Sequence, residues 1–239
     1  MDTHSTRITA YSALAVALLF LPAIAIGIAH PIPAPDTPAK DLVAFFAAHR
    51  TSLLVAFSLS GLGWGGLLIV FGGGLWAILR RAEGGSGVWS AIAFAACVAT
   101  SAAILVSITL VVTLIHLAPA LDPASLPVFF DASLVANLMT AFPNAVYVVA
   151  AGIVILRTGV MSRWVAYGGF AVAAIHLSSS VSLAREGAFS PAGVLPNLAP
   201  LSHFAWLIGV AVALLCAPPD KPMEQPRLGL GQPGTSAPS

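Results

Sequence analysis

Six runs of apolar residues divide the chain, and each is long enough to cross a bilayer as a helix, which takes about 17–25 residues. The runs cover residues 8–29, 51–79, 88–117, 129–156, 164–183 and 201–217. The pattern therefore predicts an all-α fold, a polytopic membrane bundle of six transmembrane helices in one domain over residues 1–217. Residues 218–239 are rich in proline, glycine and glutamine, which predicts a disordered cytoplasmic tail.

A short segment between the first two spans has the pattern of an amphipathic helix. Thr37 and Pro38 suit an N-cap and a first helical position. In a helix that continues to Arg50, the apolar side chains fall on one side and the charged residues elsewhere. The apolar residues are Leu42, Phe45 and Phe46, and the charged ones are Lys40 and Asp41. We expect this helix to lie on the outer surface of the membrane.

The fourth span carries a stripe of polar residues that are four, three, four and three positions apart. The stripe consists of Ser133, Asn137, Thr140, Asn144 and Tyr147. Because lipid is a poor neighbour for amide side chains, we expect the stripe to face other helices or a water-filled cavity. Pro143 cannot donate a hydrogen bond to the carbonyl of Met139, which predicts a kink near the middle of the membrane.

The composition supports a membrane protein and excludes other classes. Of the 239 residues, 58% are hydrophobic and 8% are charged, whereas a soluble domain carries about 25% charged residues. The net charge of +1 offers no basic surface to a nucleic acid. The lipid bilayer is therefore the first partner that the sequence predicts.

The basic residues predict the orientation of the bundle. If both termini are inside, seven basic residues fall in cytoplasmic segments and three in outer segments. The inner set is Arg7, Arg80, Arg81, Arg157, Arg163, Lys221 and Arg227, and the outer set is Lys40, Arg50 and Arg185. Cytoplasmic loops of membrane proteins carry an excess of basic residues, so both termini are predicted to be cytoplasmic.

Depth in the membrane brings two polar residues of neighbouring spans together. Asn144 and His176 each lie thirteen residues from an arginine at the inner surface (157 − 144 and 176 − 163). Both are then roughly 20 Å above these arginines, on helices joined by a tight connection. We expect a hydrogen bond between them, direct or through water. A neutral histidine there could position a substrate or move a proton, or the pair could simply connect two helices.

Four further histidines fall at or near the outer surface in this topology, and they raise a metal or haem hypothesis because imidazole suits zinc, copper and iron. These weak candidates are His30, His49, His116 and His203. His116 with His203 is the natural pair for a haem. None of the four shows local ligand spacing, and the alternative is amphipathic side chains at the membrane interface. The sequence names no metal site and no cofactor.

Three segments together resemble a group of uncharacterised bacterial six-span membrane proteins, classed as a domain of unknown function. The segments are Thr-Pro-Ala-Lys-Asp-Leu-Val-Ala-Phe-Phe-Ala-Ala-His-Arg at 37–50, Gly-Gly-Leu-Trp-Ala-Ile-Leu-Arg-Arg at 73–81 and Arg-Thr-Gly-Val-Met-Ser-Arg-Trp at 157–164. The resemblance covers nearly all of the chain before the tail. It implies a multi-pass protein of a bacterial inner (plasma) membrane, but no activity and no catalytic residues. Where the group usually has proline in the fourth loop, this chain has Ser162.

The polar residues of the outer half lead to one functional hypothesis and two alternatives. The hypothesis is a pocket that binds a small apolar or amphipathic molecule. Its predicted lining is Asn137, Thr140, Asn144, Tyr147, His176 and Ser180. The first alternative is an integral-membrane enzyme that uses His176 or His116 for acid–base chemistry or as a metal or haem ligand. The second is a non-catalytic subunit that binds a membrane-protein partner, or a second copy of itself, through a small-residue ridge. The ridge consists of Ser58, Gly61, Gly65 and Gly72, and the contact is expected at Gly61 and Gly65.

Overall fold

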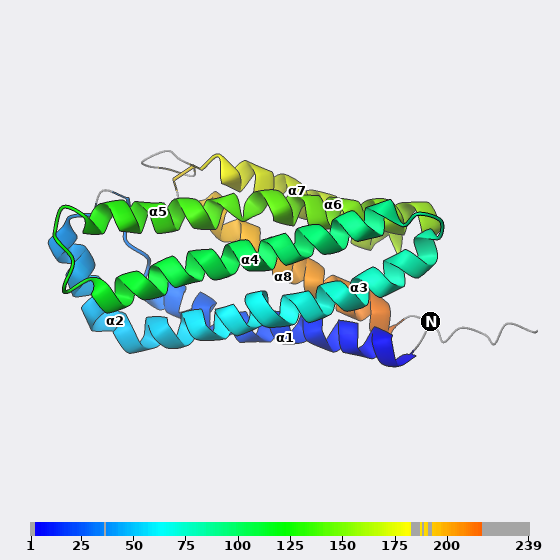
Figure 1. Ribbon diagram of the computed structural model, residues 1–239, viewed down its shortest axis with the longest axis horizontal. Coiled ribbons are helices and arrows are strands. Elements are labelled where there is room, and N and C mark those ends of the chain that lie inside the picture. The colour runs from blue at the N-terminus through cyan, green and yellow to red at the C-terminus, as the bar shows by residue number, and fades with distance from the viewer. Residues whose placement is uncertain (1–2, 36, 183–186, 188, 191–192, 217–239) are drawn as a thin grey trace, which may run out of the picture.

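The computed structural model describes residues 3–35, 37–182, 187, 189–190 and 193–216. These residues contain helices and connecting turns but no strand, and the helices form one elongated bundle (Figure 1). The helices are α1 (Thr3–Ala29), α2 (Ala39–Ser60), the π-helix η1 (Gly61–Leu67), α3 (Leu68–Glu83), α4 (Val88–Leu117), α5 (Leu126–Met139), α6 (Ala141–Thr158), α7 (Arg163–Ser180) and α8 (Val194–Leu215). The all-α prediction is confirmed, and the predicted tail at 218–239 lies outside the described residues.

Among the described residues, five helical segments are long and apolar enough to cross a membrane. They are 5–29, 39–83, 88–117, 126–158 and 194–215. The fifth predicted span corresponds to α7, which packs against α6 and α8 but is not among the five. Arg163 at its start, His176 and a run of serines at its end make α7 less apolar than its neighbours.

The predicted surface helix and the second predicted span form one continuous helical rod. α2, η1 and α3 follow one another without a break over the 45 residues 39–83, so no turn separates Arg50 from Thr51. At 1.5 Å per residue this is about 70 Å of helix, well beyond the roughly 40–45 Å of a bilayer with its headgroups. The first turns of the rod cross the end of the bundle (Figure 1, blue, left).

The apolar side of these first turns faces protein. Leu42 and Phe46 are buried, and the ring of Phe46 lies 6.1 Å from that of Phe130 in α5. Lys40 and Asp41 are exposed. The prediction of a separate helix on the membrane surface is therefore corrected, because an amphipathic pattern identifies the buried side but not what covers it.

The small-residue ridge of α2, η1 and α3 packs against α4 of the same chain. A Cβ atom on Gly65 would overlap the Leu105 side chain, and one on Gly72 would lie 2.6 Å from Cys97 Sγ. Gly65 and Gly72 are buried, whereas Ser58 is exposed. Most of the ridge therefore closes the bundle internally, as small residues do between membrane helices.

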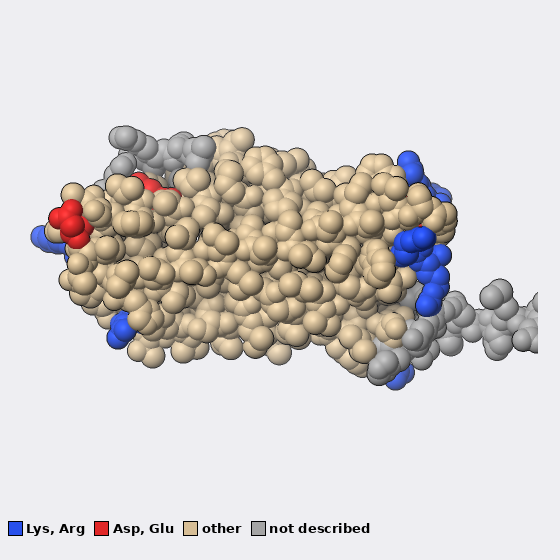
Figure 2. Space-filling view, in the orientation of Figure 1, with Lys and Arg blue, Asp and Glu red and all other residues tan. Residues whose placement is uncertain are grey.

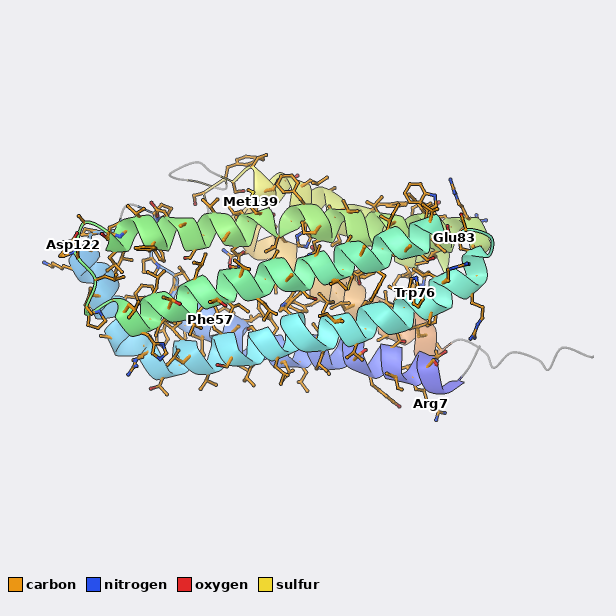
Figure 3. The ribbon with its side chains drawn as sticks, in the orientation of Figure 1. Arg7, Phe57, Trp76, Glu83, Asp122 and Met139 are labelled. Atoms are coloured by element: carbon orange, nitrogen blue, oxygen red, sulfur yellow. The ribbon has the colours of Figure 1, made fainter. Side chains whose placement is uncertain are left out.

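The predicted fourth span is two helices with a break between them. α5 ends at Met139 and α6 begins at Ala141, so Thr140 lies outside both (Met139 is labelled in Figure 3). The break follows from Pro143, which has no N–H to donate to the carbonyl four residues before it. The interruption lies where the kink was predicted, about one turn before Asn144, and the kink itself stays a prediction.

Charge separates the two ends of the bundle. Basic residues gather at the end where α3 passes into α4, and acidic residues appear at the opposite end (Figure 2). Arg7 and Glu83 are labelled at the first end and Asp122 at the second (Figure 3). α1 begins and α8 ends at the first end (Figure 1). The start of α1 and the end of α8 therefore lie at the same end of the bundle as the arginines.

Glu83 caps the start of α4. Its two carboxylate oxygens accept hydrogen bonds from the backbone N–H groups of Trp89 (3.0 Å) and Ser90 (2.8 Å). Desolvation by itself would raise the pKa of Glu83, but these two backbone hydrogen bonds, the Ser90 side chain and the charge of Arg80 together lower the pKa below its ordinary value. The carboxylate thus satisfies amides that have no partner within their own helix.

Candidate functional site

Asn144 of α6 and His176 of α7 meet inside the bundle. Asn144 Nδ2 lies 3.1 Å from His176 Nε2, at hydrogen-bonding distance, and the two residues are 1% and 5% exposed. The predicted hydrogen bond between them is confirmed. α6 and α7 come this close because they are joined by a tight connection and because Gly169 brings α7 against the carbonyl oxygen of Val148.

His203 of α8 is fully buried beside this pair. Its ring centroid lies 5.8 Å from the centroids of both His176 and Tyr147. Asn144, Tyr147, His176 and His203 thus form one group, which we call the core polar cluster.

The burial of His203 corrects its expected position at the outer surface. The sixth span was predicted to begin at Leu201, but α8 begins at Val194, about two turns earlier. Pro196 lies in the first helical turn, where a missing N–H costs no hydrogen bond, and Pro200 lies inside the helix. The prolines do not mark the end of a loop, and His203 is consequently deep in the bundle.

Flat aromatic side chains surround the cluster. The Trp64 ring lies 5.0 Å from that of His203, and the Trp206 ring lies 5.8 Å from it. Trp206 Nε1 donates a hydrogen bond to the carbonyl oxygen of Val165 in α7 at 2.9 Å, which fixes its indole. The cluster therefore combines polar atoms with apolar walls.

Four polar atoms of the cluster have no hydrogen-bond partner among the described residues. They are Nδ1 and Nε2 of His203, the hydroxyl oxygen of Tyr147 and Oδ1 of Asn144. A buried polar group without a partner costs about 1–3 kcal/mol, and most such groups in proteins are satisfied. Because neutral imidazole contains a donor and an acceptor, the cluster can offer both to a bound molecule.

The other residues of the stripe and of the predicted lining are distributed between the interior and the surface. Ser133, Thr140 and Ser180 are buried, and their hydroxyls donate to backbone carbonyls within three residues of themselves. Asn137 is exposed, so it does not face the bundle interior as the stripe predicted. Asn137 is thus the one exposed member of the stripe.

The remaining histidines do not join the cluster. His30 and His49 stack on each other with their centroids 3.9 Å apart. His116 is exposed, and its Nδ1 lies 3.0 Å from the carbonyl oxygen of Val112. The described ring contacts of His203 do not include His116, so the structure does not bring the expected haem pair together. Within the described ranges, no three histidine, cysteine or acidic residues are grouped as for a metal ion.

A narrow crevice lies between α2, α4 and α5. It measures about 40 Å³ and is lined by phenylalanines of α2 and α5 together with Ser133. Ligand pockets usually measure about 300–1,000 Å³, so the crevice does not admit a molecule in this conformation. It is also separate from the core polar cluster.

Sequence reasoning missed the part of the cluster that α8 and η1 contribute. The spacing of His203 and Trp206, one turn apart, was available in the sequence, but the depth of these two residues was not. Trp64 lies in a glycine-rich segment with no polar pattern of its own. Its role as a wall becomes visible only when the helices are packed.

Comparison of the chain with known protein families, with curated proteins and with solved structures found no match in any of the three. The class of protein therefore rests on the architecture. An apolar helical bundle with five segments long enough to cross a membrane is the architecture of an integral membrane protein.

Proposed function

We propose that this chain is a six-crossing membrane protein, with both termini in the cytoplasm, that binds a small amphipathic molecule at the core polar cluster. The observation that carries the proposal is the group of four buried polar atoms without partners on His203, Tyr147 and Asn144. Hydrogen bonds to a ligand would remove the cost of leaving these atoms unpaired.

The walls define the chemistry of the ligand. Trp64 and Trp206 present flat apolar surfaces next to His203. A suitable ligand therefore has a polar end that donates and accepts hydrogen bonds and an apolar body that packs between aromatic rings.

The polar stripe supports access from the outer half. From Asn137 onward, exposure falls from an exposed Asn137 to Thr140 at 9% and Asn144 at 1%. The break at Thr140 lies on this path, and a junction of this kind absorbs rotation of α5 relative to α6. The cluster is closed in this conformation, so binding requires such a movement.

The distribution of arginines supports the orientation. Arg7, Arg80, Arg81, Arg157 and Arg163 belong to helix ends and connections at the end of the bundle where α1 begins. The positive-inside rule assigns that end to the cytoplasm. α7 counts as the sixth crossing because it packs antiparallel to α6 along its length.

Native mass spectrometry of the protein in mild detergent and in lipid nanodiscs tests the binding proposal. The wild-type chain is expected to carry a mass excess of one small organic molecule. His203→Phe keeps an aromatic ring but removes both ring nitrogens, so the excess should be lost. His116→Phe, a matched change at an exposed histidine, should retain it. A wild-type chain without any excess in both media, or an excess that survives in folded His203→Phe, would refute the proposal.

A further inference from the structure

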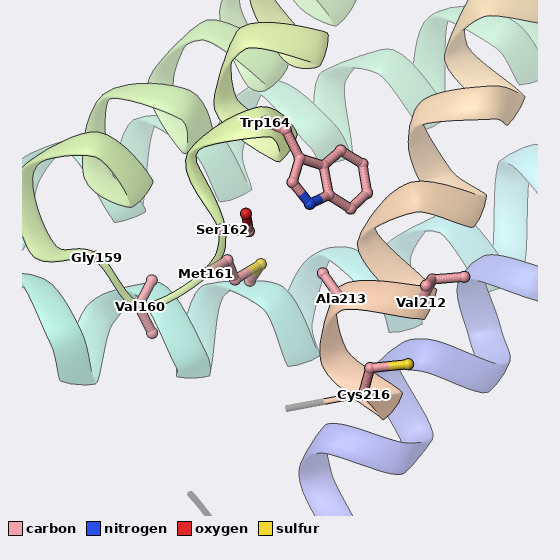
Figure 4. A pocket seen from close by; sticks show the side chains of 8 residues that line it. All are labelled: Gly159, Val160, Met161, Ser162, Trp164, Val212, Ala213 and Cys216. Atoms are coloured by element: carbon pink, nitrogen blue, oxygen red, sulfur yellow. The ribbon is translucent and has the colours of Figure 1, made fainter. Parts of the chain in front are cut away.

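A second site lies at the basic end of the bundle, away from the core polar cluster. A pocket of about 390 Å³ opens between the α6–α7 connection and the last turns of α8 (Figure 4). Gly159 to Ser162 and Trp164 form one side, and Val212, Ala213 and Cys216 form the other. Its volume is within the usual range for small-ligand pockets.

The pocket lies at the level where the apolar helices end. Trp164 is 52% exposed at its rim, and tryptophan is enriched at the depth of lipid headgroups. Val160, Met161 and Val212 supply apolar walls, while Ser162 supplies a hydroxyl. This combination suits a molecule that is polar at one end and apolar along the rest.

Two arginines flank the lining residues in the sequence, although neither is itself a lining residue. Arg163 lies between the lining residues Ser162 and Trp164, and Arg157 shortly precedes Gly159; both arginines are exposed. The one described acidic residue at this end is Glu83, whose carboxylate is held by the first amides of α4. No described carboxylate therefore offsets the arginines at the pocket.

The backbone adds to this positive potential. α7 is 18 residues long and begins at Arg163, and Ser162 makes no side-chain capping bond to it. The positive end of the α7 dipole consequently lies at the pocket. It supports the arginines but does not define the site without them.

We infer that this pocket binds the headgroup of an anionic phospholipid. The phosphate lies near Arg163 and the start of α7, and an acyl chain follows the apolar surface between α7 and α8. Basic pockets between membrane helices on the cytoplasmic side suit such headgroups. The inference does not depend on a ligand at the core polar cluster, since the two sites share no residue.

Lipid retention by the full-length protein tests the inference. The purified chain is mixed with phosphatidylglycerol and phosphatidylcholine of identical acyl chains, and native mass spectra give the ratio of the two bound lipids. The wild type is expected to prefer phosphatidylglycerol. Arg163→Gln should reduce that preference about fivefold, the effect of one basic residue near an anionic surface. Arg163→Lys should keep most of it, because the charge remains.

Two controls separate the pocket from general charge effects. Arg50→Gln removes one charge at the opposite end of the bundle and should leave the preference unchanged. Val212→Trp fills the pocket from its exposed side without changing charge, and it should reduce retention of both lipids. An equal loss of preference in Arg50→Gln and Arg163→Gln, or full retention in folded Val212→Trp, would overturn the inference. So would a dimer in the wild-type spectra that Val212→Trp dissociates, since a second copy would then fill the pocket.

Discussion

The substitution Gly72→Ala places a methyl group between α3 and α4, where its carbon would lie 2.6 Å from Cys97 Sγ and 3.3 Å from Cys97 Cβ. Real Cβ atoms do not approach a neighbour to 2.6 Å, so the helices must separate or Cys97 must change rotamer. Overpacking of this kind costs about 1–3 kcal/mol. Alanine in place of glycine within a helix stabilises the folded state by about 0.5–1 kcal/mol. We therefore expect a net loss of about 1–2 kcal/mol in the free energy of unfolding.

Gly73→Ala is the matched control on the next residue of the same helix. Its added Cβ would lie 4.0 Å from Phe94 Cε2, an ordinary contact. This variant should gain stability from the helical preference of alanine alone, about 0.5–1 kcal/mol. Thermal unfolding in mild detergent, followed by tryptophan fluorescence, measures both variants. For a chain of this size, each kcal/mol corresponds to about 2–4 °C in Tm.

A rescue experiment identifies the contact that causes the loss. Cys97→Ala removes the sulfur that the new methyl group would meet, so the double variant should recover much of the stability that Gly72→Ala loses. If Gly72→Ala were as stable as Gly73→Ala, or if Cys97→Ala gave no rescue, the packing of α3 on α4 would be refuted. The small-residue ridge would then be open to a partner, and the interpretation as a subunit of a larger complex would gain support.

Three other predictions concern hydrogen bonds. A double-mutant cycle of Asn144→Leu and His176→Phe should give a coupling of about 0.6 kcal/mol, and at most about 1.7, by thermal unfolding; zero coupling would contradict a direct bond. Glu83→Gln should cost about 1 kcal/mol at pH 7. The pKa of Glu83 is lower in the folded than in the unfolded state, so the stability difference between wild type and variant has its full value above about pH 4.3 and decreases as the pH falls through the folded pKa. A stability difference that does not depend on pH would contradict the cap. Trp206→Phe should cost about 1 kcal/mol by losing the bond to the Val165 carbonyl, and an unchanged Tm would show that this bond is dispensable.

The sequence was sufficient for features that depend on periodicity and depth. Apolar runs located the helices, and Pro143 located the break between α5 and α6 because a missing N–H acts within the same helix. The distance from the inner arginines placed Asn144 and His176 at one level, since the rise per residue is constant in a helix. These inferences need only one helix, or two helices joined by a tight turn.

Features that depend on contacts between distant segments could not be obtained in this way. The amphipathic pattern of α2 correctly predicted that Leu42 and Phe46 lie on its covered side. It could not predict what covers that side, because lipid and protein are equally apolar neighbours. The depth of His203 depended on where α8 begins, and the sequence alone did not show whether Pro196 and Pro200 precede the helix or belong to it. Asn137 belongs to the stripe by spacing, yet it is exposed, because spacing along one helix does not show which neighbour covers each side of that helix.

Three irregular stretches of helix meet at the core polar cluster. Trp64 lies in the π-helix, Asn144 lies in the first turn after the α5–α6 break, and His203 follows Pro200 by less than a turn. Each irregularity interrupts the regular hydrogen-bond ladder of its helix, and such interruptions are frequent at functional sites. If the cluster only connected helices, it would need neither the unpaired nitrogens of His203 nor three helices with interrupted backbone hydrogen bonds around it. The coincidence of both in one place is the structural reason for proposing a binding site at the cluster, and not at His30, His49 or His116.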